Sequence, residues 1–258
     1  MKEHEYQKIL VESGFSGHCA TITLSDEKTN NSLSIQMIRE LRTALMQVSS
    51  DPSINTVLLK SAGKNFCSGG GLDWLKDLGT NDSQLWRTGV TELTGLYLDL
   101  YSLHVPLIAV VQGNVVGAGV GLTCLCDVIL ADTETRWILP EVSLGMVPTI
   151  ISPALTFKVP QAHIHKLLFW KRKWTASEMQ VFGIVSEHAS QRDIADRERE
   201  VIAGYLSIDP HISRKTKKLL RSFHENPFIE RATTVQRMAL ETPDNQTDVS
   251  LIKKLLEK

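Results

Sequence analysis

The feature that most constrains this chain is a run of small residues directly after an apolar segment of strand length. The apolar segment is residues 107–111, and glycines cluster from Gly113 to Gly121. This pattern, continuing into apolar residues 122–125, predicts a buried strand, a tight turn and a buried helix. The first turn of such a helix has amide N–H groups without helical partners, and the helix dipole adds a positive field. The turn is therefore suited to hold negative charge, either a phosphate or the oxyanion of a reacting carbonyl compound.

A second glycine-rich turn follows another predicted strand. The apolar, β-branched run Thr56–Leu59 is typical of a strand buried on both faces, and the turn Gly69–Gly71 leads into a short helix with Leu72–Leu75. Upstream, Cys19–Leu24 alternates as a strand does, and apolar residues recur every three to four positions over 34–48. A strand, a helix and a strand in this order predict a right-handed crossover in an α/β layer.

The rest of the chain changes in character along its length. The pattern predicts a helix over Gln84–Leu103 and a strand over Asp127–Ala131, followed by an extended loop, Trp137–Pro148, with one carboxylate, Glu141, among apolar neighbours. After residue 160 amphipathic helices dominate; they are predicted at 161–170, 176–182, 194–206, 213–223, 227–240 and 248–257. We expect a core over residues 1–200 and a helical region over 201–258.

Composition excludes several classes of protein. The chain has 28 Lys and Arg residues against 29 Asp and Glu residues, so we expect no nucleic-acid partner. No apolar stretch approaches the roughly 20 residues that cross a bilayer, so we expect no membrane partner. The first residues are charged and no secretion signal follows, and the four cysteines lack metal-binding spacing. We expect a cytoplasmic protein with reduced thiols and no metal site.

Nucleotide binding is the main competitor for the glycine turns. The spacing Gly117-x-Gly119-x-Gly121 lacks the GxGxxG order, and no Gly-Lys-Ser/Thr sequence occurs. The motifs therefore disfavour a Rossmann or P-loop site. Either turn alone is more typical of close packing than of a ligand site. Two such turns, each able to aim one backbone N–H at a common point, favour an oxyanion hole for a thioester or a similar carbonyl.

These segments resemble, in order and spacing, the enoyl-CoA hydratase/isomerase (crotonase) superfamily. Residues 66–72 are similar to its FCAGADL turn, and 106–121 to its PxIAAVxGxxxGGGxE segment. Residues 127–132 resemble the CDxxxA strand, and 139–148 resemble the PExxxGxxP loop. The resemblance covers nearly the whole chain. It implies an α/β fold with a crotonase-like ββα spiral core and a C-terminal helical region that supports trimers or hexamers.

The resemblance also implies roles for individual residues. The backbone N–H groups of Gly70 and Ala118 would form the oxyanion hole, and Glu141 would be the catalytic acid/base. Gly121 falls where hydratases carry their first catalytic glutamate, so one carboxylate is expected in place of two. The residues expected to contact substrate are Ser68, Trp74, Leu75, Gly117 and Gly121.

One carboxylate leaves three functions open. The first is dehydration, or reversible hydration, of a β-hydroxyacyl thioester, and the second is Δ3,Δ2-enoyl isomerisation. The third is a non-catalytic protein that binds acyl thioesters. Residues 29–33, 112–121 and 242–246 are similar to the dehydratases of polyketide β-branching, which act on a 3-hydroxy-3-methylglutaryl-type group carried on an acyl carrier protein.

The expected partner is an acyl-CoA or an acyl carrier protein, and no cofactor beyond the coenzyme A or phosphopantetheine of the substrate is expected. Other polar candidates fit ordinary roles better. His163, His165 and Lys166 are typical of a solvated helix face, and the basic cluster 171–173 of a solvated loop. Cys67 fits a small packing residue, because no base for a nucleophile lies nearby in sequence.

Overall fold

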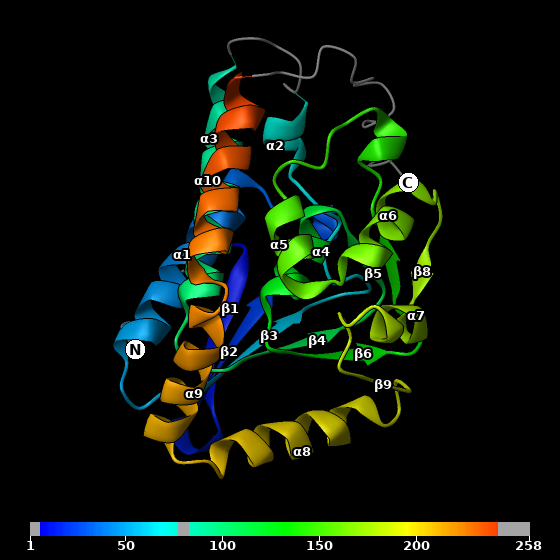
Figure 1. The fold of residues 1–258 in the computed structure, drawn as a ribbon. Helices are drawn as coiled ribbons and strands as arrows, with labels where there is room; N and C mark the ends of the chain where they lie inside the picture. Colours follow the sequence, from blue (N-terminus) through cyan, green and yellow to red (C-terminus); the bar gives the residue numbers. More distant parts are fainter. Residues whose placement is uncertain (1–5, 77–82, 242–258) are drawn as a thin grey trace.

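The computed structural model describes residues 6–76 and 83–241. The helix predicted over residues 248–257 and the matched segment 242–246 lie outside this range. Strands and helices alternate through the first two thirds of the described chain, and helices end it (Figure 1). The predicted α/β class is therefore confirmed.

A six-stranded sheet forms the base of the fold. Its strands lie in the order β1 (Ile9–Gly14), β2 (Cys19–Leu24), β3 (Thr56–Ser61), β4 (Leu107–Val111), β6 (Val128–Asp132) and β9 (Glu187–Ala189). Only the β1–β2 pair is antiparallel; the others are parallel. The predicted crossover is present, because helix α1 (Ile35–Ser50) joins the parallel strands β2 and β3. The edge strands β1 and β9 were not predicted from the sequence.

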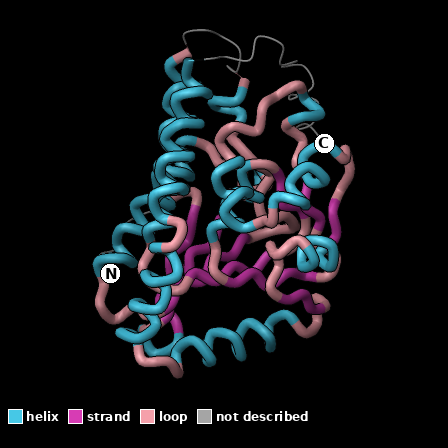
Figure 2. The backbone as a smooth tube through the Cα atoms, viewed as in Figure 1, coloured by secondary structure: helices cyan, strands magenta, loops and turns pink. Residues whose placement is uncertain are grey.

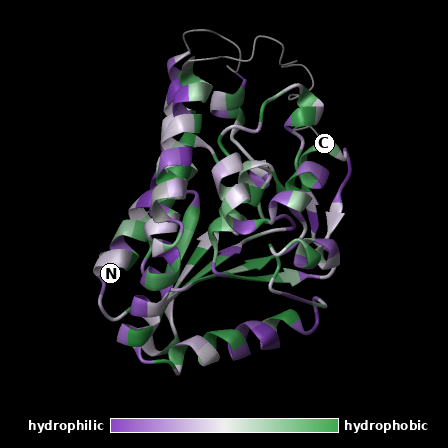
Figure 3. Ribbon diagram, in the orientation of Figure 1, coloured by the Kyte–Doolittle hydropathy of each residue, from purple (hydrophilic) through white to green (hydrophobic). Residues whose placement is uncertain are grey.

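The sheet is buried on both faces, which explains why β4 is apolar at every position and why β3 and β6 are apolar over most of their length. Alternate residues of each strand point to opposite sides. One set packs into the main core with the helices above the sheet, and the other set packs with Ile202 of helix α8 (Ile194–Leu206). Helix α8 runs below the sheet in Figure 2. This second cluster contains Cys19, Leu58, Ile108, Val110 and Leu130. In Figure 3 the central strands of this sheet are accordingly mostly green, the colour of hydrophobic residues.

A second sheet of three short strands lies beyond the ends of the main strands. It is formed by β5 (Asn114–Val116), β7 (Arg136–Ile138) and β8 (Trp174–Thr175). β5 pairs in parallel with β7, which places Val116 opposite Ile138. This pairing matters for the site, because β5 leads into the glycine turn and β7 leads into the loop that carries Glu141.

The central helix of the fold is α4 (Ala118–Leu125), and all eight of its residues are buried. It begins at Ala118, four residues before Leu122, where the predicted apolar run begins. The prediction began later because the glycine-rich residues before Leu122 show no continuous apolar pattern. Helices α3 (Gln84–Ser102) and α5 (Ser152–Lys158) pack against α4, and α5 was not predicted from the sequence. The short helix α2 (Leu72–Leu75) contacts α3. Helix α3 packs against α1, α2 and α4.

The described chain after residue 160 is mostly helical, as predicted. Its helices are α6 (Gln161–Phe169), α7 (Ala176–Val181), α8, α9 (Pro210–Ser222) and α10 (Glu225–Glu241), and the two short strands β8 and β9 lie between α6 and α8. Helix α9 is tied to the core because Lys217 Nζ and Arg221 Nη2 donate to the carboxylate of Asp127, at 2.6 and 2.8 Å. Helix α10 packs on α3 and α5 (Figure 1).

Candidate active site

The two glycine turns predicted from sequence lie side by side. Backbone bonds join Cys67 to β5: its N–H donates to the Asn114 carbonyl at 3.2 Å, and its carbonyl accepts from Val116 N–H at 2.9 Å. The side chain of Asn65 adds a second link, because its Oδ1 accepts from the backbone N–H and Nδ2 of Asn114. This link between Asn65 and Asn114 was not predicted from the sequence, although both residues stand at the borders of the turns.

The first turn presents the amide of Gly70. Leu33 brackets this residue, because its N–H donates to the Gly69 carbonyl at 2.7 Å and its carbonyl accepts from Gly71 N–H at 2.9 Å. The N–H of Gly70 donates to no residue that the structure describes. A Cβ on Gly70 would lie 2.8 Å from Cζ2 of Trp74, so a side chain here would displace the ring. The amide of Gly70 is therefore a free donor on a tightly packed turn.

The second turn presents the amide of Ala118. Gly117 precedes it with φ 45° and ψ −111°, a conformation that side chains rarely adopt. The Gly117 N–H donates to the Ile138 carbonyl at 2.9 Å, and its carbonyl accepts from the N–H groups of Val120 and Gly121. The Ala118 N–H, at the positive end of α4, donates to no described residue.

Glu141 lies against this helix start. It is the third residue after Ile138, the end of β7, and a Cβ on Gly117 would lie 2.7 Å from the Glu141 Oε1. The following 3₁₀ turn (Val142–Leu144) and Met146 fix the backbone, because Leu144 and Met146 N–H donate to the Glu141 carbonyl. The β5–β7 pairing therefore delivers the carboxylate to the same helix end that carries the free Ala118 amide.

The carboxyl group of Glu141 is almost fully buried, with 9% of the residue exposed. Its Oε2 is inaccessible and has no hydrogen-bond partner in the described part of the chain. Burial raises the pKa of this carboxyl from 4.5 to about 7, since the charged form loses its hydration. Near neutral pH the group can therefore accept and return a proton with little cost.

The other predicted site residues lie around these three, with differing contacts. The Ser68 hydroxyl donates to the Thr29 carbonyl at 2.9 Å. Trp74 is buried behind Gly70, and its Nε1 donates to the Leu33 carbonyl at 2.9 Å. Leu75 is half-buried, and its Cδ1 would lie 3.0 Å from a Cβ on Gly70.

Gly121 is buried beneath a residue that sequence analysis missed. A Cβ on Gly121 would lie 2.1 Å from the hydroxyl oxygen of Tyr97, which projects from helix α3. That hydroxyl donates to the Ala118 carbonyl at 2.7 Å. Within the sequence Tyr97 is one more residue on the apolar side of α3, so no local signal distinguishes it.

The remaining candidates have structural contacts. Burial raises the pKa of the Cys67 thiol to about 12, which suits a packing residue and not a nucleophile. His163 packs on Phe182, and the Lys166 ammonium lies 4.8 Å from the ring centre of Trp170. No group of three or more potential metal ligands occurs among residues 6–76 and 83–241. Within those ranges no helix is long and apolar enough to span a membrane.

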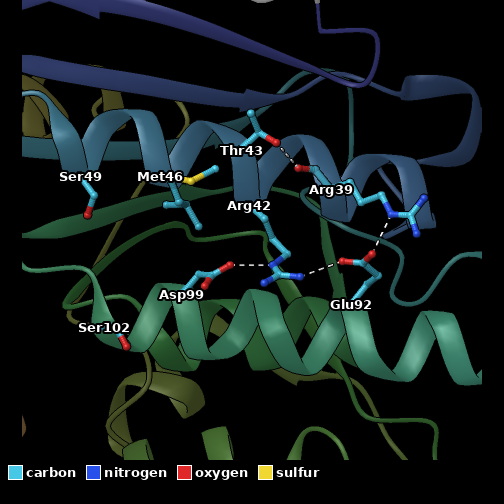
Figure 4. Close-up of a pocket in the computed structure, with 9 residues that line it drawn as sticks. Arg39, Arg42, Thr43, Met46, Ser49, Glu92, Asp99 and Ser102 are labelled. Carbon is cyan, nitrogen blue, oxygen red and sulfur yellow. Dashed lines mark hydrogen bonds and ion pairs between the residues drawn. The ribbon is translucent and has the colours of Figure 1, made fainter.

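A separate pocket of about 630 Å³ lies on the outer side of α3, between α1 and α3 (Figure 4). Its charged groups are satisfied by each other. Arg42 donates to Glu92 at 2.8 Å and to Asp99 at 2.7 Å, and Arg39 donates to Glu92 at 2.7 Å. This pocket leaves no unpaired charge for a ligand, whereas the Glu141 site combines an unpaired carboxylate with two free amides.

Free amides on two neighbouring turns and a buried carboxyl group against one of them are the kinds of group that carbonyl chemistry uses. The model of the enoyl-CoA hydratase/isomerase family matches residues 14–258, so the chain belongs to this family, whose members act on acyl thioesters. A Thermus thermophilus protein whose name assigns it to the enoyl-CoA hydratases is 30% identical over 207 residues, covering 79% of this chain and 81% of that protein. The carnitinyl-CoA dehydratase of Proteus mirabilis is 26% identical over 202 residues, covering 78% and 76%.

Solved structures confirm the crotonase fold. An enoyl-CoA hydratase from Bacillus halodurans superimposes with a TM-score of 0.85 at 19% identity, over 97% of this chain and 99% of that chain. An enoyl-CoA hydratase/isomerase from Xanthobacter autotrophicus Py2 gives 0.84 at 20% identity, over 96% and 91%. At such identities the similarity defines the fold, and the reaction must be argued from the site.

Proposed function

We propose that this protein is a lyase that dehydrates, or reversibly hydrates, a β-hydroxyacyl thioester. The observation that carries the proposal is the Glu141 carboxyl group, which is buried, has one unpaired oxygen and has a pKa of about 7, beside the free amide of Ala118. An acid/base of this pKa is half ionised near neutral pH, so the same group can first remove a proton and then donate it.

The reaction follows from these groups. The thioester oxygen would accept hydrogen bonds from the Gly70 and Ala118 N–H groups, which stabilise the negative charge that develops there. Ionised Glu141 removes the proton on the α carbon, and the electron pair of that C–H bond enters the enolate. When the enolate collapses, the C–O bond at the β carbon breaks. Protonated Glu141 gives its proton to the departing hydroxyl, which leaves as water, and an α,β-double bond remains.

Substitution of Glu141 by Gln tests the assignment directly. The variant keeps the shape of the side chain but cannot take a proton, so we expect it to fold and bind thioester while losing turnover. The assay incubates a short-chain 3-hydroxyacyl-CoA with the enzyme and follows product by mass spectrometry. Retention of most of the wild-type rate by E141Q would contradict the proposal.

Isomerisation is the second candidate, because a single acid/base also suffices to move a proton between two carbons of an enolate. The product mass separates the two reactions: dehydration removes one water, whereas a Δ3,Δ2 shift leaves the mass unchanged. Failure of the wild-type protein to exchange the α protons of any bound acyl thioester with deuterated water would favour the third candidate, a non-catalytic binding protein.

We further propose that the acyl group is of the 3-hydroxy-3-methylglutaryl type on an acyl carrier protein, as in polyketide β-branching. Its support is the sequence similarity at 29–33, 112–121 and 242–246, together with Gly121 at the first glutamate position. Turnover of the same acyl group on coenzyme A and on a carrier protein tests this point. A kcat/KM that is equal or higher with coenzyme A would refute the carrier assignment.

We also propose a trimer or hexamer, assembled through the helical region 201–258. Apolar side chains stand exposed on and next to α9: Ile212, Leu219, Leu220 and Phe223 are each more than half exposed. Such a patch is unusual on a monomer's surface. Light scattering of the purified protein gives the mass in solution, and a monomer at micromolar concentration would refute this proposal.

A further inference from the structure

The hydroxyl group of Tyr97, on helix α3, contacts the first turn of α4. Tyr97 is buried, with 2% exposed, and its Oη occupies the space above Gly121, where a Cβ would lie only 2.1 Å away. Gly121 has an ordinary helical backbone, because it is not among the positive-φ glycines. The glycine at this position is therefore required by the phenol ring and not by the backbone.

The hydroxyl of Tyr97 holds the helix start in place. It donates to the Ala118 carbonyl at 2.7 Å, and helix α4 has no side-chain N-cap. Among the described residues, the other side-chain hydrogen bond to residues 118–121 comes from α4 itself, where the Thr123 hydroxyl donates to the Val120 carbonyl at 2.8 Å. Burial, with further contributions from Cys67, Cys124 and Glu141, raises the pKa of Tyr97 well above its ordinary value. The hydroxyl therefore stays protonated and remains a donor.

The position of this contact connects it to the site. The Glu141 carboxylate lies against Gly117, and the Tyr97 hydroxyl lies against Gly121, one helical turn further along α4. Ala118, whose free N–H would hold the oxyanion, is between them. The orientation of the Ala118 N–H depends on how the first turn of α4 is held. The N-cap residue, Gly117, has no side chain that could cap this turn.

We propose that Tyr97 is a positioning residue of the oxyanion hole, whose hydroxyl, through the Ala118 carbonyl, fixes the amide that faces the thioester oxygen. This inference rests on the proposed function. It also gives a reason for the absent first glutamate: the phenol takes the space in which that side chain would begin. A carboxylate at position 121 therefore requires a smaller residue at position 97.

The test uses two matched tyrosines of α3. Tyr97→Phe removes the hydroxyl that bonds the Ala118 carbonyl, and Tyr101→Phe removes one that bonds the Arg221 carbonyl at 3.0 Å, one helical turn away. Both tyrosines are buried, at 2% and 3% exposed. The assay measures exchange of the α protons of a short-chain 3-hydroxyacyl-CoA with deuterated water, together with the midpoint of thermal unfolding.

We expect Y97F to lower kcat about 10-fold and to leave KM within about twofold of the wild-type value. This loss of kcat lies between the effect of losing one buried hydrogen bond and the effect of losing an oxyanion-hole donor. Y101F should keep the wild-type kcat at a similar loss of thermal stability. The pH midpoint of the exchange rate should stay near 7 in Y97F, because Glu141 is untouched. An equal kcat in Y97F and Y101F would overturn the proposal, as would a shifted midpoint.

Gly121→Ala supplies an independent arm. The added Cβ would push the hydroxyl away from Ala118, so we expect its loss of kcat to be non-additive with that of Y97F, whereas additive losses would contradict the proposal. The E141Q variant separates the two levels of inference. If E141Q abolishes exchange and Y97F does not lower it, only the role of Tyr97 fails. If wild-type protein exchanges the α protons of a 3-hydroxyacyl group neither on coenzyme A nor on a carrier protein, both proposals fail.

Discussion

Ionisation of Glu141 should destabilise the folded protein, and the size of this effect follows from its burial. The pKa of the carboxyl is raised from 4.5 to about 7 in the folded state. Between these two values the folded protein binds more protons than the unfolded chain, so stability falls as pH rises through this window. Each unit of pKa shift corresponds to about 1.4 kcal/mol, so the penalty reaches about 3 kcal/mol above pH 7.

Glu141→Gln removes this penalty, because the amide resembles the protonated acid and never ionises. We expect the variant to gain stability relative to wild type as pH rises from below 4.5 to above about 7, by about 3 kcal/mol, and no further above that. The measurement is the free energy of unfolding from denaturant titrations of both proteins at several pH values. Constant effects of the amide, such as its own hydrogen bonds, cancel in the comparison between pH values.

A matched control is Glu134→Gln, which removes a carboxylate that is 82% exposed and pairs with Arg136. A surface substitution of this kind should change stability by less than about 0.5 kcal/mol at every pH tested. If the difference between E141Q and wild type does not vary with pH, the carboxyl is not desolvated as the structure describes. The argument for a neutral-pH acid/base would then fail with it.

Three further predictions concern the same scaffold. The rate of α-proton exchange should rise with pH to a plateau, with a midpoint near 7, because only ionised Glu141 is a base. The measurement covers pH 5 to 9, roughly two units on either side of this pKa, and a rate independent of pH over that range would contradict the prediction. Gly117→Ala should reduce turnover by about 100-fold, because φ is 45° and the new Cβ would lie 2.7 Å from the Glu141 Oε1; near-normal kcat would refute the close contact. Asp127→Asn should cost about 3–5 kcal/mol in denaturant titrations, because Lys217 and Arg221 then lose their buried counter-charge; a loss below about 1 kcal/mol would show that this ion pair does not anchor α9.

The pH dependence of Asp127 has the opposite sign from that of Glu141. Burial by itself would raise the pKa of this carboxyl, but the charges of Lys217 and Arg221 outweigh burial and lower it. Its contribution to stability is therefore present at neutral pH and is lost as pH falls through the lowered pKa. Wild type should thus lose stability in acid, whereas the pH profile of Asp127→Asn should lack this component.

Local patterns in the sequence were enough to predict most of the longer helices and strands. The strand Cys19–Leu24 and helix α1 appear where alternation and three-to-four spacing place them, because both patterns record which side of an element is buried. The short strands β5, β7, β8 and β9 were not predicted. Two or three residues are too few to show a period, and only pairing with distant segments makes them strands.

The chemical groups of the site could also be named from sequence, through the glycine turns and the resemblance that their order carries. Gly70, Ala118 and Glu141 were all predicted, and the structure brings two free amides and a buried carboxyl group onto adjoining segments. Their roles in catalysis stay predictions until the substitutions above are measured.

What the sequence by itself determined is most of the longer helices and strands and the place of the two glycine turns, at which we predict that backbone amides face a ligand, since glycine content and periodicity are local properties. The tertiary structure alone decided how these positions meet. The Cys67–β5 bonds bring the two turns together, β7 carries Glu141 to Gly117, and α3 places the Tyr97 hydroxyl over Gly121. The pKa of Glu141 belongs to this second group, because desolvation depends on every segment packed around the carboxyl and on no single stretch of the chain.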